Sequence, residues 1–258
     1  MIIRENTIRI DEPTKENMLE AQDDLSFEDA VFFDLEHYVY KKPKCVGVFG
    51  ACYFSPVNSE IKVTQYMIEN REEVKDILIL AKRYLEDICE NEGKSSIVTF
   101  SGNNDFTVIN YLFNKYKVDF SFEEHFKSVD LQKEYEKVKK ESIGLKNLEK
   151  LFNIERENGD LISGANLAKT FHKVLKDKDY IFRMPKEKIE KILVYNEADV
   201  VNLFHIYKDW KQYMIVEKEE EEIEEVEDIE DIEDVEDVEE IEKIEEEFQE
   251  EIKESCTI

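Results

Sequence analysis

The chain has 258 residues and an apolar fraction of 41%, which allows one sizeable domain or two small ones with a real core. Its net charge is −28, but residues 217–251 hold 23 acids and two lysines and so carry −21, which leaves −7 for the remainder. Four scattered cysteines and four scattered histidines exclude a zinc signature and a disulfide framework. Without a long apolar run or a signal peptide, we expect a soluble cytoplasmic protein that does not enter a membrane.

The first part of the chain predicts strands. Residues 1–26 are mixed in character, with isoleucines that suit a short edge strand, and we set them apart as an N-terminal segment. Apolar strands are predicted over 30–37, 45–54 and 61–67, with residues 41–44 as a turn. Three strands joined by short turns predict an antiparallel meander.

Helices dominate the second part of the chain. Helical spacing of apolar residues covers 71–90, and further strands are expected at 96–100 and 127–131 with a helix from Asp105 between them. Four more helices are predicted near 132–140, 145–153, 163–176 and 186–213. This order predicts an α/β fold with a mixed sheet whose first three strands are antiparallel, the order of the ribonuclease H-like fold. We expect that domain to span 27–216.

One buried strand ends in two carboxylates, in the stretch Val31-Phe32-Phe33-Asp34-Leu35-Glu36-His37. Residues two apart on a strand point to the same face, so Asp34 and Glu36 are expected roughly 7 Å apart on one side. Either the strand has emerged into a polar loop, or the pair is half of a divalent-metal site. Hard oxygen ligands of this kind suit Mg²⁺ or Mn²⁺.

Two further acids fall on apolar helix stripes. Asp105 follows core-type spacing at a helix start, where an N-cap or first-turn acid is the alternative. Asp199 interrupts the apolar stripe of the last helix, where a buried ion pair with an arginine or lysine is the alternative. Tyr195 lies one turn before Asp199 on the same face. Two divalent cations would satisfy all four acids and form the clamp that hydrolyses phosphodiesters.

Several segments, in this order, resemble a known family. The DLE stretch, a GNND segment before a helix and YNEAD in the last helix resemble the DEDD superfamily of 3′→5′ exonucleases, in its DEDDy branch. The segments FSGNNDFTVINYL, SVDLQKEY and LVYNEADVVNLFHIY resemble the YprB-like ribonuclease H-like exonuclease family more closely. The resemblance covers about residues 28–212.

The resemblance implies roles for these residues and a single-stranded 3′ end of DNA or RNA as substrate. Asp34 would bridge two Mg²⁺ or Mn²⁺ ions, while Glu36 and Asp199 would hold the ion that activates water. Asp105 would support the second ion, and Tyr195 would orient the attacking water. Departures from the family pattern fall around residues 101–108 and at 128. A separate question concerns Asp130, which is either an auxiliary acid or a strand-end cap.

The acidic tail, 217–258, is of low complexity. Its branched aliphatic residues recur at period three from Ile223 to Ile244, which wraps around a helix and leaves no apolar face. A solvated tail that is disordered or transiently helical is expected, and the alternative is a nucleic-acid mimic that screens the active site or binds a basic protein partner. Two rivals to the exonuclease also remain, a catalytically weak nucleic-acid-binding scaffold and a structure-specific endonuclease on the same fold.

Overall fold

The computed structural model describes residues 1–21, 25–156 and 163–214. The described residues belong to one compact unit, Met1–Met214, and the acidic tail lies outside them. Within the described part, no helix combines the length and the apolarity that a bilayer crossing requires.

A mixed sheet forms the centre of the described unit, in the order β1-β4-β3-β2-β5-β6. Its strands are β1 (Ile2–Arg9), β2 (Ala30–Tyr40), β3 (Lys42–Ser55), β4 (Glu60–Met67), β5 (Ser96–Thr99) and β6 (Lys127–Asp130). Neighbours from β1 to β2 pair antiparallel, whereas β5 pairs parallel with both β2 and β6. The predicted α/β class and antiparallel meander are confirmed.

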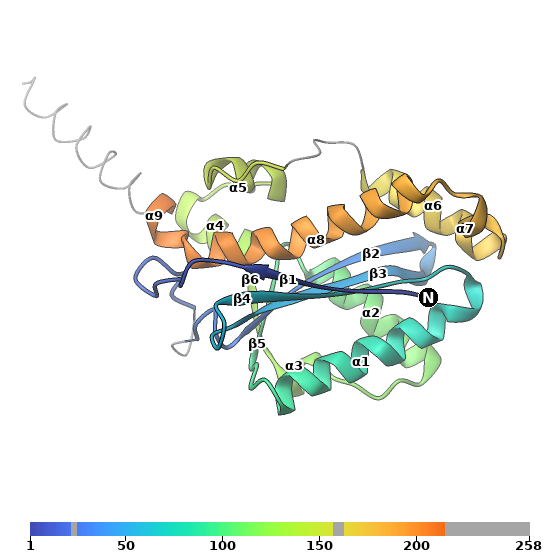
Figure 1. Ribbon diagram of the computed structural model, residues 1–258, viewed down its shortest axis with the longest axis horizontal. Coiled ribbons are helices and arrows are strands. Elements are labelled where there is room, and N and C mark those ends of the chain that lie inside the picture. The colour runs from blue at the N-terminus through green and yellow to red at the C-terminus, as the bar shows by residue number, and fades with distance from the viewer. Residues whose placement is uncertain (22–24, 157–162, 215–258) are drawn as a thin grey trace, which may run out of the picture. The chain divides into compact units, whose positions relative to one another are not determined.

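Helices cover both faces of this sheet. They are η2 (Arg71–Glu73), α1 (Val74–Glu90), α2 (Asn103–Tyr116), α3 (Phe122–His125), α4 (Leu131–Lys139), α5 (Leu145–Leu151), α6 (Gly164–Lys176), α7 (Tyr180–Arg183), α8 (Lys186–Lys208) and α9 (Trp210–Met214). In Figure 1, α8 runs along one face and α1 and α2 lie on the other. Ser163 caps α6 through its side chain, and α8 begins directly after Pro185.

β2 is central because both of its faces are apolar. Val31, Phe33 and Leu35 join the core cluster that contains α1 and α2, while Phe32 joins the cluster that contains α8. A strand covered on both faces gives a continuous apolar run rather than an alternating one. The carboxylates that follow are therefore held by a strand packed from both sides.

Several predicted boundaries are wrong. β2 and β3 extend through most of the expected turn at 41–44, which reduces it to Lys41 with a φ of 60°. Backbone pairing continues the hairpin beyond the buried core, where polar side chains carry no signal for a strand. The edge strand expected within residues 1–26 is present, since β1 pairs with β4 at the edge of the sheet. The last predicted helix ends at Lys208, and α9 follows it.

Candidate active site

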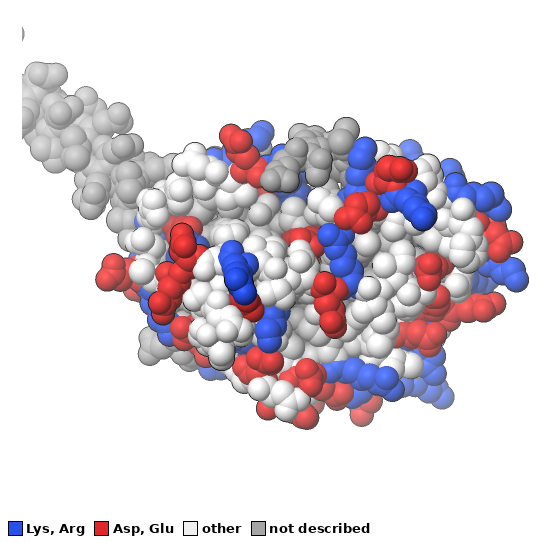
Figure 2. Space-filling model, in the orientation of Figure 1, with Lys and Arg blue, Asp and Glu red and all other residues white. Residues whose placement is uncertain are grey.

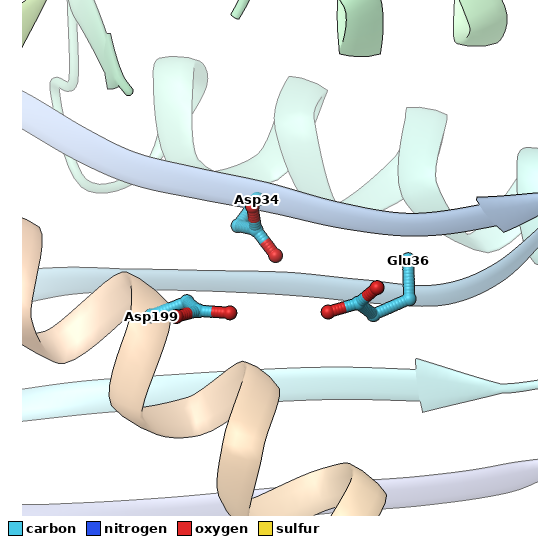
Figure 3. Close-up of side chains that lie close together, drawn as sticks. All are labelled: Asp34, Glu36 and Asp199. Carbon is cyan, nitrogen blue, oxygen red and sulfur yellow. The ribbon is translucent and has the colours of Figure 1, made fainter. Parts of the chain in front are cut away.

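Three carboxylates converge on one point beside the sheet. Asp34 and Glu36 project from β2 and Asp199 from α8, and one oxygen of each lies within 4.8 Å of the others. Figure 3 shows the three side chains pointing toward one another. The period-two spacing on the strand and the apolar stripe on the helix therefore bring together the acids that the sequence singled out.

Two more of the predicted residues line the same cleft. This cleft has a volume of about 580 Å³, and its walls include Asp105 and Tyr195 together with the three carboxylates. Asp105 lies in the first turn of α2 with only 9% of its surface exposed, and its Oδ1 is 3.5 Å from Nε2 of His37. Since α2 begins at Asn103 with Gly102 before it, Asp105 is not the N-cap.

Burial and mutual repulsion raise the pKa values of these acids. Burial, and then the charge of Asp105, raises the pKa of Asp34 to about 7. The pKa of Asp105 also rises to about 7, first through burial and then through Asp130 and Asp199. The pKa values of Glu36 and Asp199 lie well above their ordinary values for the same reasons. Ionised together, the acids favour a bound cation.

One cation of the chain already reaches the cluster. Nη2 of Arg156 lies 2.5 Å from Oδ1 of Asp199, and its Nε lies 2.8 Å from Oε2 of Glu149. The guanidinium also stacks over the ring of Tyr195, 5.2 Å from its centroid. The buried ion pair considered for Asp199 is therefore present, in addition to the carboxylate cluster. The charge of the same guanidinium also opposes the rise in the pKa values of Asp34 and Glu36.

A chain of amides orients Asp34. Nδ2 of Asn196 donates to Oδ2 of Asp34 at 3.0 Å, and Nε2 of Gln65 donates to Oδ1 of Asn196 at 2.8 Å. Asn196 is fully buried, and it fits because the neighbouring strand carries Gly50 there, where a Cβ would overlap the amide. The bond from Asn196 fixes the orientation of the Asp34 carboxylate.

The geometry of Asp130 matches a strand-end cap. Its carboxylate accepts from the backbone N–H groups of Ser101 at 2.9 Å, Gly102 at 3.2 Å and Gln132 at 3.1 Å. These bonds hold the loop that leads into α2 and so position Asp105. Asp130 is not part of the three-carboxylate cluster found among the described residues.

The residues that bind and orient the acids were not predicted from the sequence. Arg156, Asn196 and Gln65 act through contacts between segments far apart in the chain. A local signal existed only for Asn196, which stands next to Tyr195 in the YNEAD stretch. His37 was also missed, although it follows Glu36 directly; its Nε2 lies 3.0 Å from Nδ2 of Asn104, and burial lowers its pKa.

Comparison with known proteins gives one family. A model described as the RNase_H superfamily matches residues 31–211, from the start of β2 to the start of α9, and these include every residue of the cleft discussed above. No curated protein shows a significant match to the chain.

Proposed function

The chain belongs to the RNase H superfamily, and from this premise we propose that it is a two-metal-dependent 3′→5′ exonuclease acting on DNA or RNA. The superfamily indicates a metal-dependent nuclease acting on nucleic acid, and the exonuclease activity and its polarity are our inference. The observation that carries the proposal is the convergence of Asp34, Glu36 and Asp199 within 4.8 Å. Three carboxylates this close are a poor arrangement for stability alone.

The donor set fits hard divalent ions. All the converging groups are carboxylate oxygens, which suit Mg²⁺ or Mn²⁺. Asp34, Glu36 and Asp199 would hold the first ion, and Asp34 with Asp105 would hold the second. When bound, two such ions lower the pKa of the attacking water and neutralise charge on the leaving oxygen.

The other residues of the chain position the reacting groups. The hydroxyl of Tyr195 would orient the attacking water, since its ring lines the cleft one turn before Asp199. Asn196 and Gln65 would hold Asp34 in one orientation, and Asp130 would fix the loop that carries Asp105. Burial, followed by the charges of Asp199 and Glu36, raises the pKa of Tyr195, so the phenol stays protonated and can donate.

One observation favours a second candidate, a nucleic-acid-binding scaffold with weak catalysis. The guanidinium of Arg156 already neutralises Asp199, so the cluster has a built-in substitute for part of the metal charge. In the exonuclease proposal this guanidinium must give way when an ion reaches Asp199. In the scaffold alternative it would stay in place.

A labelled-end assay separates these possibilities. Single-stranded DNA and RNA, each labelled at the 5′ end, would be incubated with the protein and either Mn²⁺ or EDTA. A ladder shortening by single nucleotides in Mn²⁺ alone supports the 3′→5′ exonuclease. Release of one internal fragment would point to an endonuclease, and binding without cleavage would point to the scaffold.

A further inference from the structure

A second cleft, of about 650 Å³, presents aromatic rings at the surface. It lies where the end of the β2–β3 hairpin meets α6 and the end of α2, and its walls include Tyr38, Tyr40 and Tyr116. Tyr40 is 59% exposed, and the ring of Tyr38 packs edge-on against His172 at 5.2 Å. Exposed rings offer π faces on which nucleic-acid bases stack without regard to sequence.

The same cleft is strongly basic. Four cations line it, namely Lys44, Arg71, Lys115 and Lys176, and its described lining includes no carboxylate. None of the four pairs with an acid in the part of the chain that the structure describes. Nζ of Lys44 lies 5.9 Å from the ring centroid of Tyr40 and so shares the space beside that ring. We refer to this site as the basic aromatic cleft.

This concentration of positive charge is local. On the face shown in Figure 2, acidic and basic side chains are interspersed, and no continuous basic stripe crosses the view. Residues 1–216 carry −7 overall. A cleft with four cations and no acid in its described lining is therefore a place where a polyanion can approach an otherwise repulsive surface.

The basic aromatic cleft and the carboxylate cleft are neighbours in the fold. The pairing between β2 and β3 shifts register after Glu36 and again after Tyr38. In this stretch of β2, His37 and Val39 line the carboxylate cleft, and Tyr38 and Tyr40 line the other. Helix α6 also serves both clefts, with Ala168 in the first and His172, one turn or about 6 Å later, in the second. A strand ending at the carboxylates could therefore continue into the basic aromatic cleft.

We propose that the basic aromatic cleft binds the single strand of nucleic acid whose terminal nucleotide lies at the carboxylates. Bases stack on Tyr40 and Tyr116, and phosphates lie against Lys44, Lys115 and Arg71. The proposal rests on the proposed function for the identity of the strand, but its test does not require hydrolysis.

A second basic groove makes the proposal specific. The groove of about 520 Å³ between α6 and α8 is lined by four lysines, Lys169, Lys173, Lys188 and Lys191. Its described lining also includes Glu187 and contains no aromatic ring. It could attract phosphate but could not stack bases. Substitution of two of its lysines therefore gives a control with the same loss of charge.

The experiment measures binding of full-length protein to a fluorescent single-stranded 10-mer in EDTA at several salt concentrations. We expect Tyr40→Ala to weaken binding by roughly 5- to 100-fold, the range for loss of one stacked base, without changing the salt slope. Tyr40→Phe, which keeps the ring, should bind like the wild type. The double variant Lys44→Gln/Lys115→Gln should reduce the slope of log affinity against log salt by about 1.4, because each single-strand phosphate contact contributes about 0.7.

The control pair is Lys169→Gln/Lys188→Gln, which should leave the salt slope unchanged. If this pair lowers the slope and Lys44→Gln/Lys115→Gln does not, the strand follows the α6–α8 groove and the proposal is wrong. Equal losses in Tyr40→Ala and Tyr40→Phe would overturn the stacking role, and no binding by the wild type at low salt would overturn the site. Thermal melts confirm folding, which the exposure of Tyr40 should preserve.

The outcome is separable from the nuclease assignment. A protein that binds through these residues but never hydrolyses the strand would support the cleft and refute the exonuclease. A protein that hydrolyses normally while Tyr40→Ala binds like the wild type would refute the cleft alone.

Discussion

Replacing Asp34 by asparagine should stabilise the metal-free protein. The pKa of Asp34 is raised from an ordinary 3.8 to about 7, chiefly by burial and then by the charge of Asp105. Since one pKa unit corresponds to about 1.4 kcal/mol, ionised Asp34 destabilises the native state by up to about 4 kcal/mol. Partial exposure to the cleft lowers this estimate to about 2–4 kcal/mol. The neutral amide introduced by Asp34→Asn avoids the cost, and its oxygen can still accept the hydrogen bond from Asn196.

The sign follows from the direction of this shift. Asp34 binds its proton more tightly in the native state than in the unfolded state. The protonated side chain therefore contributes stability that is complete below about pH 4 and is lost as the pH rises to 7. The advantage of Asp34→Asn should therefore be full at pH 8 and about half as large at pH 5.5. For a domain of this size, about 2–4 kcal/mol corresponds to roughly 5–15 °C in Tm.

The assay is thermal unfolding at pH 8 and pH 5.5, in EDTA and in Mn²⁺. Mn²⁺ should raise the Tm of the wild type, because it binds the native state, and should raise that of Asp34→Asn less. Asp119→Asn, which removes an exposed carboxylate outside the cleft, serves as the control and should behave like the wild type. Equal Tm values for wild type and Asp34→Asn in EDTA at pH 8, with equal shifts in Mn²⁺, would refute the reasoning.

Three other changes test the remaining parts of the site. Arg156→Gln leaves Asp199 and Glu149 buried without their cation, so the metal-free protein should lose about 3–5 kcal/mol of stability. Mn²⁺ should then raise the Tm of this variant more than that of the wild type. An unchanged shift in Tm would show that Arg156 and the ion do not compete. Tyr195→Phe should lower turnover by roughly ten- to a thousand-fold, while the affinity for Mn²⁺ measured by calorimetry should hardly change. A large loss of Mn²⁺ affinity would instead make Tyr195 a residue that positions Asp199. Truncation after Met214 removes the −21 segment and should tighten single-strand binding most at low salt; identical binding of both proteins at low salt would leave the tail no role in access.

The acids of the site were predictable because local periodicity determines them. Asp34 and Glu36 share a face because strand side chains alternate, and Asp199 points inward because it lies on the apolar stripe of its helix. Asp105 was assigned to the sheet side by the same reasoning, and it is buried there. Each of these inferences used only residues within one element.

The supporting residues depend on contacts between elements, and sequence spacing does not encode these. Arg156 reaches Asp199 from the segment after α5, and Gln65 reaches Asn196 from β4. The end of the β2–β3 hairpin was also missed, because backbone pairing extends β3 into the stretch Lys42-Pro43-Lys44, which has the composition of a turn. This end of the hairpin carries Tyr38 and Tyr40 into the lining of the basic aromatic cleft, and no sequence pattern indicated that cleft.

Metal-dependent hydrolysis by Asp34→Ala is the most direct test of the central claim. The measurement is the rate of shortening of 5′-labelled single-stranded DNA and RNA in Mn²⁺, for wild type, Asp34→Ala and the control Asp119→Ala. We predict shortening by the wild type and the control, and a loss of several orders of magnitude in Asp34→Ala. Near-wild-type hydrolysis by Asp34→Ala would contradict the assignment of the carboxylate cluster as the active site.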